Sequence, residues 1–185
     1  WTLPSNVALC MNPNEVYAKI SVDGENFIML KSLIPTLFED GTYKIVYEKK
    51  GKEFEGHKYV PLFNYVEKQV KNAYFVTVDD YVTTEDGTGI VHIAPAFGEE
   101  DYQVGKKYNI DFVQLVDEEG KMSKETDFAG MFVKEADKPI IDKLKSEGKL
   151  FKVKLIEHAY PHCWRCGTPL LYYAKNAWFV KTTAI

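Results

Sequence analysis

Short apolar runs separated by turn residues fill the first 130 positions, and this pattern restricts the fold most strongly. Residues 17–22 and 26–30 flank Asp23-Gly24, a dipeptide that favours a two-residue hairpin turn. Residues 44–48 and 53–60 flank a Lys-Gly turn in the same way. Further strands of the same character are predicted at 74–78, 81–83, 89–93 and 112–116. So many short, non-repeating strands favour a β-barrel-like or folded-over sheet.

Two helices are predicted outside the strands, so the expected class is α+β, mainly β with peripheral helices. Residues 99–108 begin with acidic side chains and end near two lysines, which matches the polarity of a helix dipole. A second helix is predicted over residues 136–147, where apolar side chains recur on one face. Gly148 follows as a stop signal, and Pro139 is expected in the first turn of this helix.

The chain is long enough for one domain and a small appendage. With 185 residues, 45% of them hydrophobic, it can bury a core. The composition shifts near Glu157, so residues 1–156 are expected to form the main domain. Residues 157–185 hold a C-x-x-C between two proline-marked turns and are expected to form a knuckle and a strand. The chain starts at Trp1 rather than methionine, and we expect it to be a segment of a larger protein.

Charge and cysteine content limit the function classes. The net charge is −4 and Arg165 is the sole arginine, so the chain lacks the basic excess of a protein that grips a nucleic-acid duplex by itself. No apolar run approaches about 18 residues, so no membrane contact is expected. Three cysteines without a leader peptide favour a reducing, cytoplasmic compartment. Cys10 is expected to be a buried strand residue.

The stretch GTGIVHIAPAFGEEDY, residues 87–102, places a lone His92 near the end of an apolar strand. Pro95 ends the strand, and Gly98 leads into a helix whose first turn contains Asp101. A carboxylate in a first helical turn is stabilised by free N–H groups and is expected to stay ionised at pH 7. From these residues alone two interpretations stay open, a functional site or helix-start acids beside a structural histidine.

The stretch WTLPSN, residues 1–6, is a polar loop before an apolar strand. Thr2, Ser5 and Asn6 cluster around Pro4. By itself this pattern indicates a turn that is held by side-chain-to-backbone hydrogen bonds.

Together these two stretches resemble the editing domain of isoleucyl-tRNA synthetases, which is inserted in the catalytic domain of these class I enzymes. In the relatives that edit for valine and leucine, an arginine-containing, threonine-rich loop replaces WTLPSN, and the histidine is absent. The resemblance covers nearly the whole chain and extends to PLF at 61–63, DFAGMFVKEADKPIIDKLK at 127–145 and YPHCWRCGTPLLYYAKNAWF at 160–179.

The resemblance implies a role for each candidate residue. Asp101 would hold the α-ammonium group of the substrate, and His92 would line the amino-acid pocket and exclude side chains larger than valine. Thr2, with Asp101 and His92, is expected to take part in catalysis. The implied substrate-binding set is Trp1, Thr2, Asn6, His92, Ala94, Phe97 and Asp101. The family also has threonines just before the tryptophan that contribute to the site.

The implied reaction is hydrolysis of valine from isoleucine tRNA, or of valyl-adenylate. A pocket for isoleucine rejects valine weakly because one methylene is worth only about 1–3 kcal/mol, a figure established with this enzyme family rather than derived from these residues. A second site that is gated by size removes the error. No serine or cysteine nucleophile stands beside a histidine in the sequence, so direct attack by a positioned water is favoured. The general base stays open between a ribose hydroxyl and His92.

The C-x-x-C at Cys163 and Cys166 is half of a tetrahedral zinc site. The resemblance implies that the other ligands lie in the parent enzyme, and that ATP and magnesium serve only its synthetic site. No cofactor is expected for editing. GKMSKET, residues 120–126, is similar to an ATP-binding loop of class I synthetases, but no partner motif exists and we interpret it as a charged loop.

The expected partners are the acceptor end of isoleucine tRNA carrying valine and the rest of the parent synthetase. Two other functions stay open. A non-catalytic zinc knuckle that binds RNA would show stoichiometric zinc without ester hydrolysis. An inert structural insertion would show neither binding nor turnover.

Overall fold

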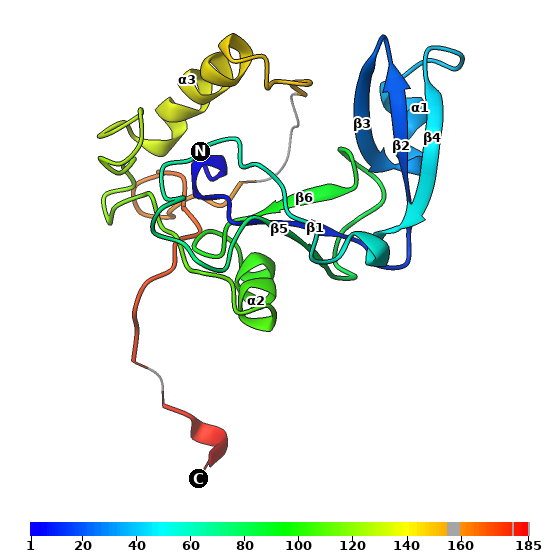
Figure 1. Cartoon of the computed structure of the whole chain (residues 1–185). Coiled ribbons are helices and arrows are strands. Elements are labelled where there is room, and N and C mark those ends of the chain that lie inside the picture. The colour runs from blue at the N-terminus through cyan, green and yellow to red at the C-terminus, as the bar shows by residue number, and fades with distance from the viewer. Residues whose placement is uncertain (155–159, 179, 185) are drawn as a thin grey trace.

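The computed structural model describes residues 1–154, 160–178 and 180–184, and it contains two three-stranded sheets (Figure 1). The first sheet has the order β5-β1-β6, in which β1 runs parallel to β5 and antiparallel to β6. The second has the order β3-β2-β4 and is antiparallel throughout. The strands are β1 (Ala8–Met11), β2 (Val16–Val22), β3 (Glu25–Leu30), β4 (Lys44–Lys50), β5 (Phe75–Val78) and β6 (Ile90–Ile93).

Helices lie around the sheets, with α2 beside the first sheet and α3 near the N-terminus (Figure 1). None of the helices in the described part of the chain is long and apolar enough to cross a bilayer. The α-helices are α1 (Ile34–Leu37), α2 (Glu99–Lys107) and α3 (Val133–Ser146). The 3₁₀ helices are η1 (Leu3–Ser5), η2 (Lys31–Leu33), η3 (Gly51–Phe54) and η4 (Thr182–Ala184).

The α+β class is confirmed, but a barrel-like closure is not shown. Among the described residues neither sheet closes on itself. The strands of the first sheet are four residues long, and three of the segments predicted to extend the β structure are not strands. In the described part of the chain, no further strand therefore pairs with both β5 and β6 to close the first sheet, and no strand joins the two sheets.

The predicted strand at 53–60 is wrong, because the chain forms the 3₁₀ helix η3 after β4 and does not pair back with β4 as a hairpin. Gly51 donates its N–H to the Glu15 carbonyl and begins η3, and β4 pairs with β2. The predicted strand at 81–83 lies in a turn. The predicted strand at 112–116 forms a single bridge at Val116, since the N–H of Leu115 bonds to the Ser5 hydroxyl rather than to a neighbouring strand.

The second predicted helix is correct in place but starts earlier, at Val133. Phe132 is its N-cap residue, and the Phe132 carbonyl accepts hydrogen bonds from Glu135 and Ala136. Pro139 therefore lies inside the helix, and its expected position in the first turn is wrong. Proline there lacks the N–H that would bond to the carbonyl four residues earlier.

Alternation along β1 and β6 gives the first sheet two distinct faces. Ala8, Cys10 and Ile93 are fully buried in a core with Val104 of α2. Leu9 and His92, which are paired across the two strands, project from the opposite face. The prediction that Cys10 is a buried strand residue is confirmed, and burial raises the pKa of its thiol to about 11.

The start of β6 packs against the end of β3, and a glycine makes this approach possible. Gly89 has a φ of +71°, and a Cβ at this position would lie 2.4 Å from Cβ of Leu30. The Leu30 N–H bonds to the Thr88 carbonyl at 2.8 Å in the same place. Gly87 has a similar φ of +69° but has open space around it.

These two glycines give a matched test of the packing. Alanine at either position is strained by the positive φ, but at position 89 alone it also clashes with Leu30. We expect Gly89→Ala to lower the free energy of unfolding by about 1–3 kcal/mol more than Gly87→Ala, measured by urea denaturation. Equal losses in the two variants would show that the sheets do not approach each other here as described.

Candidate functional site

His92 lies on β6 and faces the N-terminal loop. Its Nε2 atom is 3.1 Å from Oγ1 of Thr2, within hydrogen-bond distance. Its Nδ1 atom is buried and has no hydrogen-bond partner in the described part of the chain. Burial lowers the pKa of His92 from 6.5 to about 4. The imidazole is therefore neutral at pH 7 and presents a bulky, uncharged surface.

Trp1 and Phe97 lie beside this pair. Their rings meet edge to face with centroids 5.0 Å apart, and Phe97 and Ala94 are buried in a core that α3 covers. The structure thus links Thr2 to His92 through a hydrogen bond and Trp1 to Phe97 through a ring contact.

Asp101 is the third residue of α2, and its carboxylate turns back to the end of β6. One oxygen accepts the Ala94 N–H at 2.9 Å, and the Tyr81 hydroxyl lies 3.5 Å from the other. Gly98 leaves room for this turn, because a Cβ there would lie 3.3 Å from the Asp101 carboxyl carbon. The neighbouring Glu99 is exposed and accepts a hydrogen bond from Gln103 instead.

Burial and the position at the helix start act in opposite directions on the Asp101 carboxylate. The position in the first helical turn was expected to favour the ionised form, but burial dominates and raises the pKa above 3.8. The hydrogen bonds from Ala94 and Tyr81 oppose this shift only in part. A cationic ligand beside this carboxylate would favour its ionised form.

Among the described residues, Asp101 and the Asn6 side chain form no hydrogen bond with His92 or Thr2. No hydrogen bond joins His92 to Asp101 among the described residues, because His92 projects from a face of β6 and Asp101 reaches the backbone at the strand end. Asn6 is turned to Tyr59 and Ala8, to which its amide group bonds. Tyr59 and Tyr81, which hold Asn6 and Asp101, were missed because no local sequence pattern marks such distant partners.

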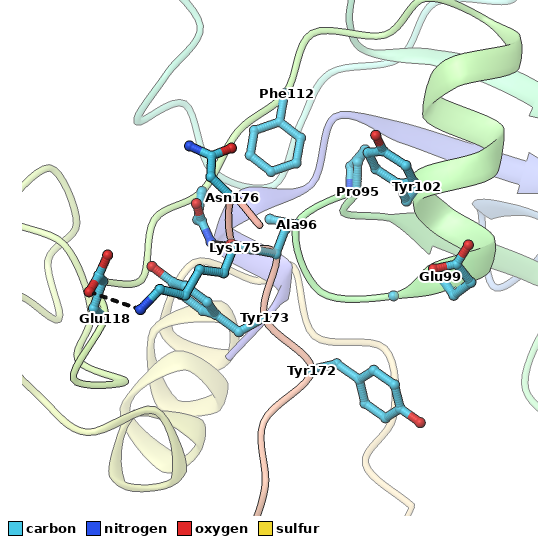
Figure 2. Close-up of a pocket in the computed structure, with 13 residues that line it drawn as sticks. Pro95, Ala96, Glu99, Tyr102, Phe112, Glu118, Tyr172, Tyr173, Lys175 and Asn176 are labelled. Carbon is cyan, nitrogen blue, oxygen red and sulfur yellow. Dashed lines mark hydrogen bonds and ion pairs between the residues drawn. The ribbon is translucent and has the colours of Figure 1, made fainter. Parts of the chain in front are cut away.

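A hollow of about 980 Å³ lies next to this site rather than in it (Figure 2). The C-terminal segment forms one wall, where the Ala174 N–H bonds to the Ala96 carbonyl at 2.9 Å and Lys175 pairs with Glu118 at 3.3 Å. The wall from the loop before α2 includes Pro95, Ala96, Gly98 and Glu99. Trp1, Thr2, His92 and Asp101 do not line this hollow.

The C-x-x-C forms a tight turn in which Gly167 donates to the Cys163 carbonyl and Cys163 donates to the Thr168 carbonyl, both at 2.8 Å. Both thiols are free, and hydrogen bonds from Thr168 lower the pKa of Cys166. Two thiols on one turn fit half of a tetrahedral zinc site. The described residues contain no group of three or more metal-binding side chains, and His158 lies outside them.

The ATP-loop-like segment 120–126 takes part in local structure. Met122 is 2% exposed and bridges to Val116, and Lys121 bridges to Phe132. The Lys121 ammonium group pairs with Glu119 at 2.6 Å. These contacts agree with the interpretation of this segment as a charged loop.

No family model matches the chain. The chain is 50% identical to the isoleucine–tRNA ligase of Clostridium novyi, 46% identical to that of Clostridium acetobutylicum and 43% identical to that of Picrophilus torridus. Each alignment covers the whole chain but only 18% of the relative, so the chain spans about a fifth of the length of the curated relatives it matches.

Solved structures share the fold. GlLeuRS-CP1 matches with a TM-score of 0.60 at 15% identity, covering 84% of this chain and 81% of that one. The editing domain of P. knowlesi cytosolic leucyl-tRNA synthetase matches with a TM-score of 0.58 at 12% identity, covering 94% of this chain and 81% of that one.

The lowered pKa of His92 predicts a pH-dependent loss of stability. Between pH 6.5 and about 4 the unfolded chain binds a proton at His92 and the folded chain does not, so the free energy of unfolding falls as the pH falls. The loss attributable to His92 should approach the order of 3 kcal/mol at pH 4.

His92→Gln serves as the comparison, since it removes the titrating group and leaves every carboxylate in place. Urea denaturation of both proteins at pH 7 and pH 4 should show a smaller loss in the variant. The same loss in both proteins would mean that His92 titrates alike in the folded and unfolded chain.

Proposed function

The chain is related over its whole length to one segment of isoleucine–tRNA ligases and has the fold of CP1 editing domains, and from this premise we propose that it hydrolyses valine from isoleucine tRNA. The observation that carries the proposal is the group of Thr2, His92, Trp1 and Phe97, with Asp101 at the end of the same strand. This arrangement supplies a size limit, a polar contact and an anionic group close to one another.

His92 acts as the size limit. Its ring is neutral and held by Thr2, and its strand pairs with β1, so the ring forms a firm surface that limits the size of the substrate. Valine fits against this surface and isoleucine, which is one methylene longer, does not. Steric exclusion gives a larger discrimination than the weak preference that a slightly oversized pocket provides.

Asp101 holds the α-ammonium group of the substrate. One oxygen accepts the Ala94 N–H, and the other lies 3.5 Å from the Tyr81 hydroxyl. Lone pairs therefore remain for a charged donor. An ammonium group favours the ionised carboxylate and offsets the burial that raises the pKa of Asp101.

The reaction is direct hydrolysis. Water attacks the ester carbonyl carbon, the bond from that carbon to the ribose oxygen breaks, and the ribose oxygen takes up a proton. Free valine and uncharged tRNA result. Thr2 orients the water, and a neighbouring ribose hydroxyl of the tRNA takes up the water's proton while it gives its own proton to the departing ribose oxygen. Proximity and orientation supply most of the acceleration.

The remaining partners belong to the parent ligase. Cys163 and Cys166 provide two thiolates of a zinc site that other parts of the ligase complete. ATP and magnesium serve its synthetic site, and editing needs no cofactor. The acceptor end of the tRNA reaches this segment in the cytoplasm, where its three cysteines stay reduced.

Removal of the charge of Asp101 tests the ammonium contact. Asp101→Asn keeps the shape of the side chain and loses a charge-assisted hydrogen bond of about 1.5–3 kcal/mol, so deacylation of valylated tRNA by the intact ligase should slow by about 10- to 150-fold. Glu99→Gln and Glu100→Gln are matched controls on the same helical turn and should stay near the wild-type rate. Equal losses in all three variants would mean that the acids serve only the helix.

Variants of His92 test the size limit. His92→Ala should open the pocket and permit hydrolysis of isoleucylated tRNA, which the wild-type ligase spares. His92→Phe keeps a bulky ring without a hydrogen bond to Thr2 and should still exclude isoleucine. If His92→Ala abolishes valine hydrolysis and still excludes isoleucine, the residue is catalytic rather than a size limit.

A further inference from the structure

Tyr59 holds the amide group of Asn6 in a fixed orientation. The Tyr59 hydroxyl donates to Oδ1 of Asn6 at 2.5 Å, and Nδ2 of Asn6 donates to the Ala8 carbonyl at 2.7 Å. Both ends of the amide group are thus used within the protein. Asn6 is therefore better placed to fix the loop that carries it than to contact a substrate.

The ring of Tyr59 is itself fixed by a strained neighbour. Tyr59 donates its N–H to the Tyr74 carbonyl at 3.1 Å, and Tyr74 donates its own to the Val7 carbonyl at 2.6 Å. The two rings meet edge to face at 6.1 Å. Tyr74 has a φ of +60°, a conformation that bulky side chains rarely adopt, so the surrounding contacts must hold it.

The loop that Asn6 anchors leads directly to the candidate site. The Asn6 N–H bonds to the Leu3 carbonyl, and the Ser5 N–H bonds to the Thr2 carbonyl. On the other side, the Val7 N–H bonds to the Ile93 carbonyl at 2.9 Å, next to His92. The side-chain bonds to Tyr59 and Ala8 fix Asn6 at the end of this turn, so their loss would allow the turn, and Thr2 with it, to shift relative to His92.

We propose that Tyr59 is a positioning residue for the editing reaction, which acts through Asn6 to hold Thr2 against His92. The inference rests on the proposed function for its kinetic consequence, but the hydrogen bond itself can be tested without activity. Tyr59 touches neither the substrate nor the reacting atoms in this scheme. Its effect should therefore appear in the rate of hydrolysis more than in the affinity for the ester.

Tyr74 provides a matched control in the same ring pair. Its hydroxyl is buried and has no hydrogen-bond partner in the described part of the chain. Tyr59→Phe and Tyr74→Phe each delete one hydroxyl and keep the ring, but Tyr59→Phe alone removes one of the two hydrogen bonds of the Asn6 amide and leaves the bond to the Ala8 carbonyl. Removal of an unpaired buried hydroxyl should leave the fold and the site unchanged.

The first measurement is hydrogen exchange of the Asn6 side-chain amide, followed by NMR in this chain. We expect slow exchange of this amide in the wild type and in Tyr74→Phe, and faster exchange in Tyr59→Phe, where the bond from Nδ2 to the Ala8 carbonyl alone holds the group. The second measurement is deacylation of valylated isoleucine tRNA by the intact ligase. Tyr59→Phe should lower kcat about 10-fold with little change in KM, and Tyr74→Phe should stay within about 2-fold of the wild type.

The possible failures are distinguishable. Unchanged exchange of the Asn6 amide in Tyr59→Phe, or equal kcat values in the two variants, would overturn the role of Tyr59. A wild-type ligase that does not hydrolyse the valyl ester would instead overturn the proposed function. The exchange experiment would then still decide whether Tyr59 fixes Asn6.

Discussion

The buried hydroxyl of Tyr17 joins two sheets that share no strand ladder. It accepts a hydrogen bond from the Asn12 N–H at 2.8 Å and donates one to the Gly89 carbonyl at 2.6 Å. Tyr17 belongs to β2 of the second sheet, whereas Asn12 and Gly89 adjoin β1 and β6 of the first. Gly89 directly precedes β6, so the strand that carries His92 depends on this link. Each backbone group left unpaired here would cost about 1–3 kcal/mol.

Burial acts in opposite directions on the two titratable groups at this strand. It lowers the pKa of His92 and raises the pKa of Asp101, so in each case burial favours the neutral form of the side chain. A neutral histidine can limit the size of the bound side chain without attracting the phosphates of a tRNA. A carboxylate that burial disfavours gains from a cationic partner, and the α-amino group of an aminoacyl ester is such a partner. The same desolvation thus suits both proposed roles.

The features that the sequence predicted correctly are mainly local. Asp23 and Gly24 form the expected hairpin turn, and both have the positive φ values that a two-residue turn requires. The acids and lysines at the ends of α2 mark its limits. The proximity of Thr2 and His92 could be expected only from the family resemblance, because residue types alone do not indicate that positions 90 residues apart lie together.

The features that the sequence could not predict depend on distant partners. Residues 112–116 alternate like a strand, yet the Leu115 N–H is taken by a serine hydroxyl 110 positions away. Tyr59 reaches Asn6 across 53 positions, and neither residue carries a local signal of the other. The upward shift of the Asp101 pKa was not foreseen, because the helix start is visible in the sequence and the burial around it is not.

The central claim is that this segment discriminates between two esters by size. It is tested most directly by presenting the wild-type ligase with valylated and isoleucylated isoleucine tRNA and following the loss of each amino acid. The account predicts rapid loss of valine while isoleucine stays attached. Equal rates for the two esters, or no hydrolysis of either, would contradict it.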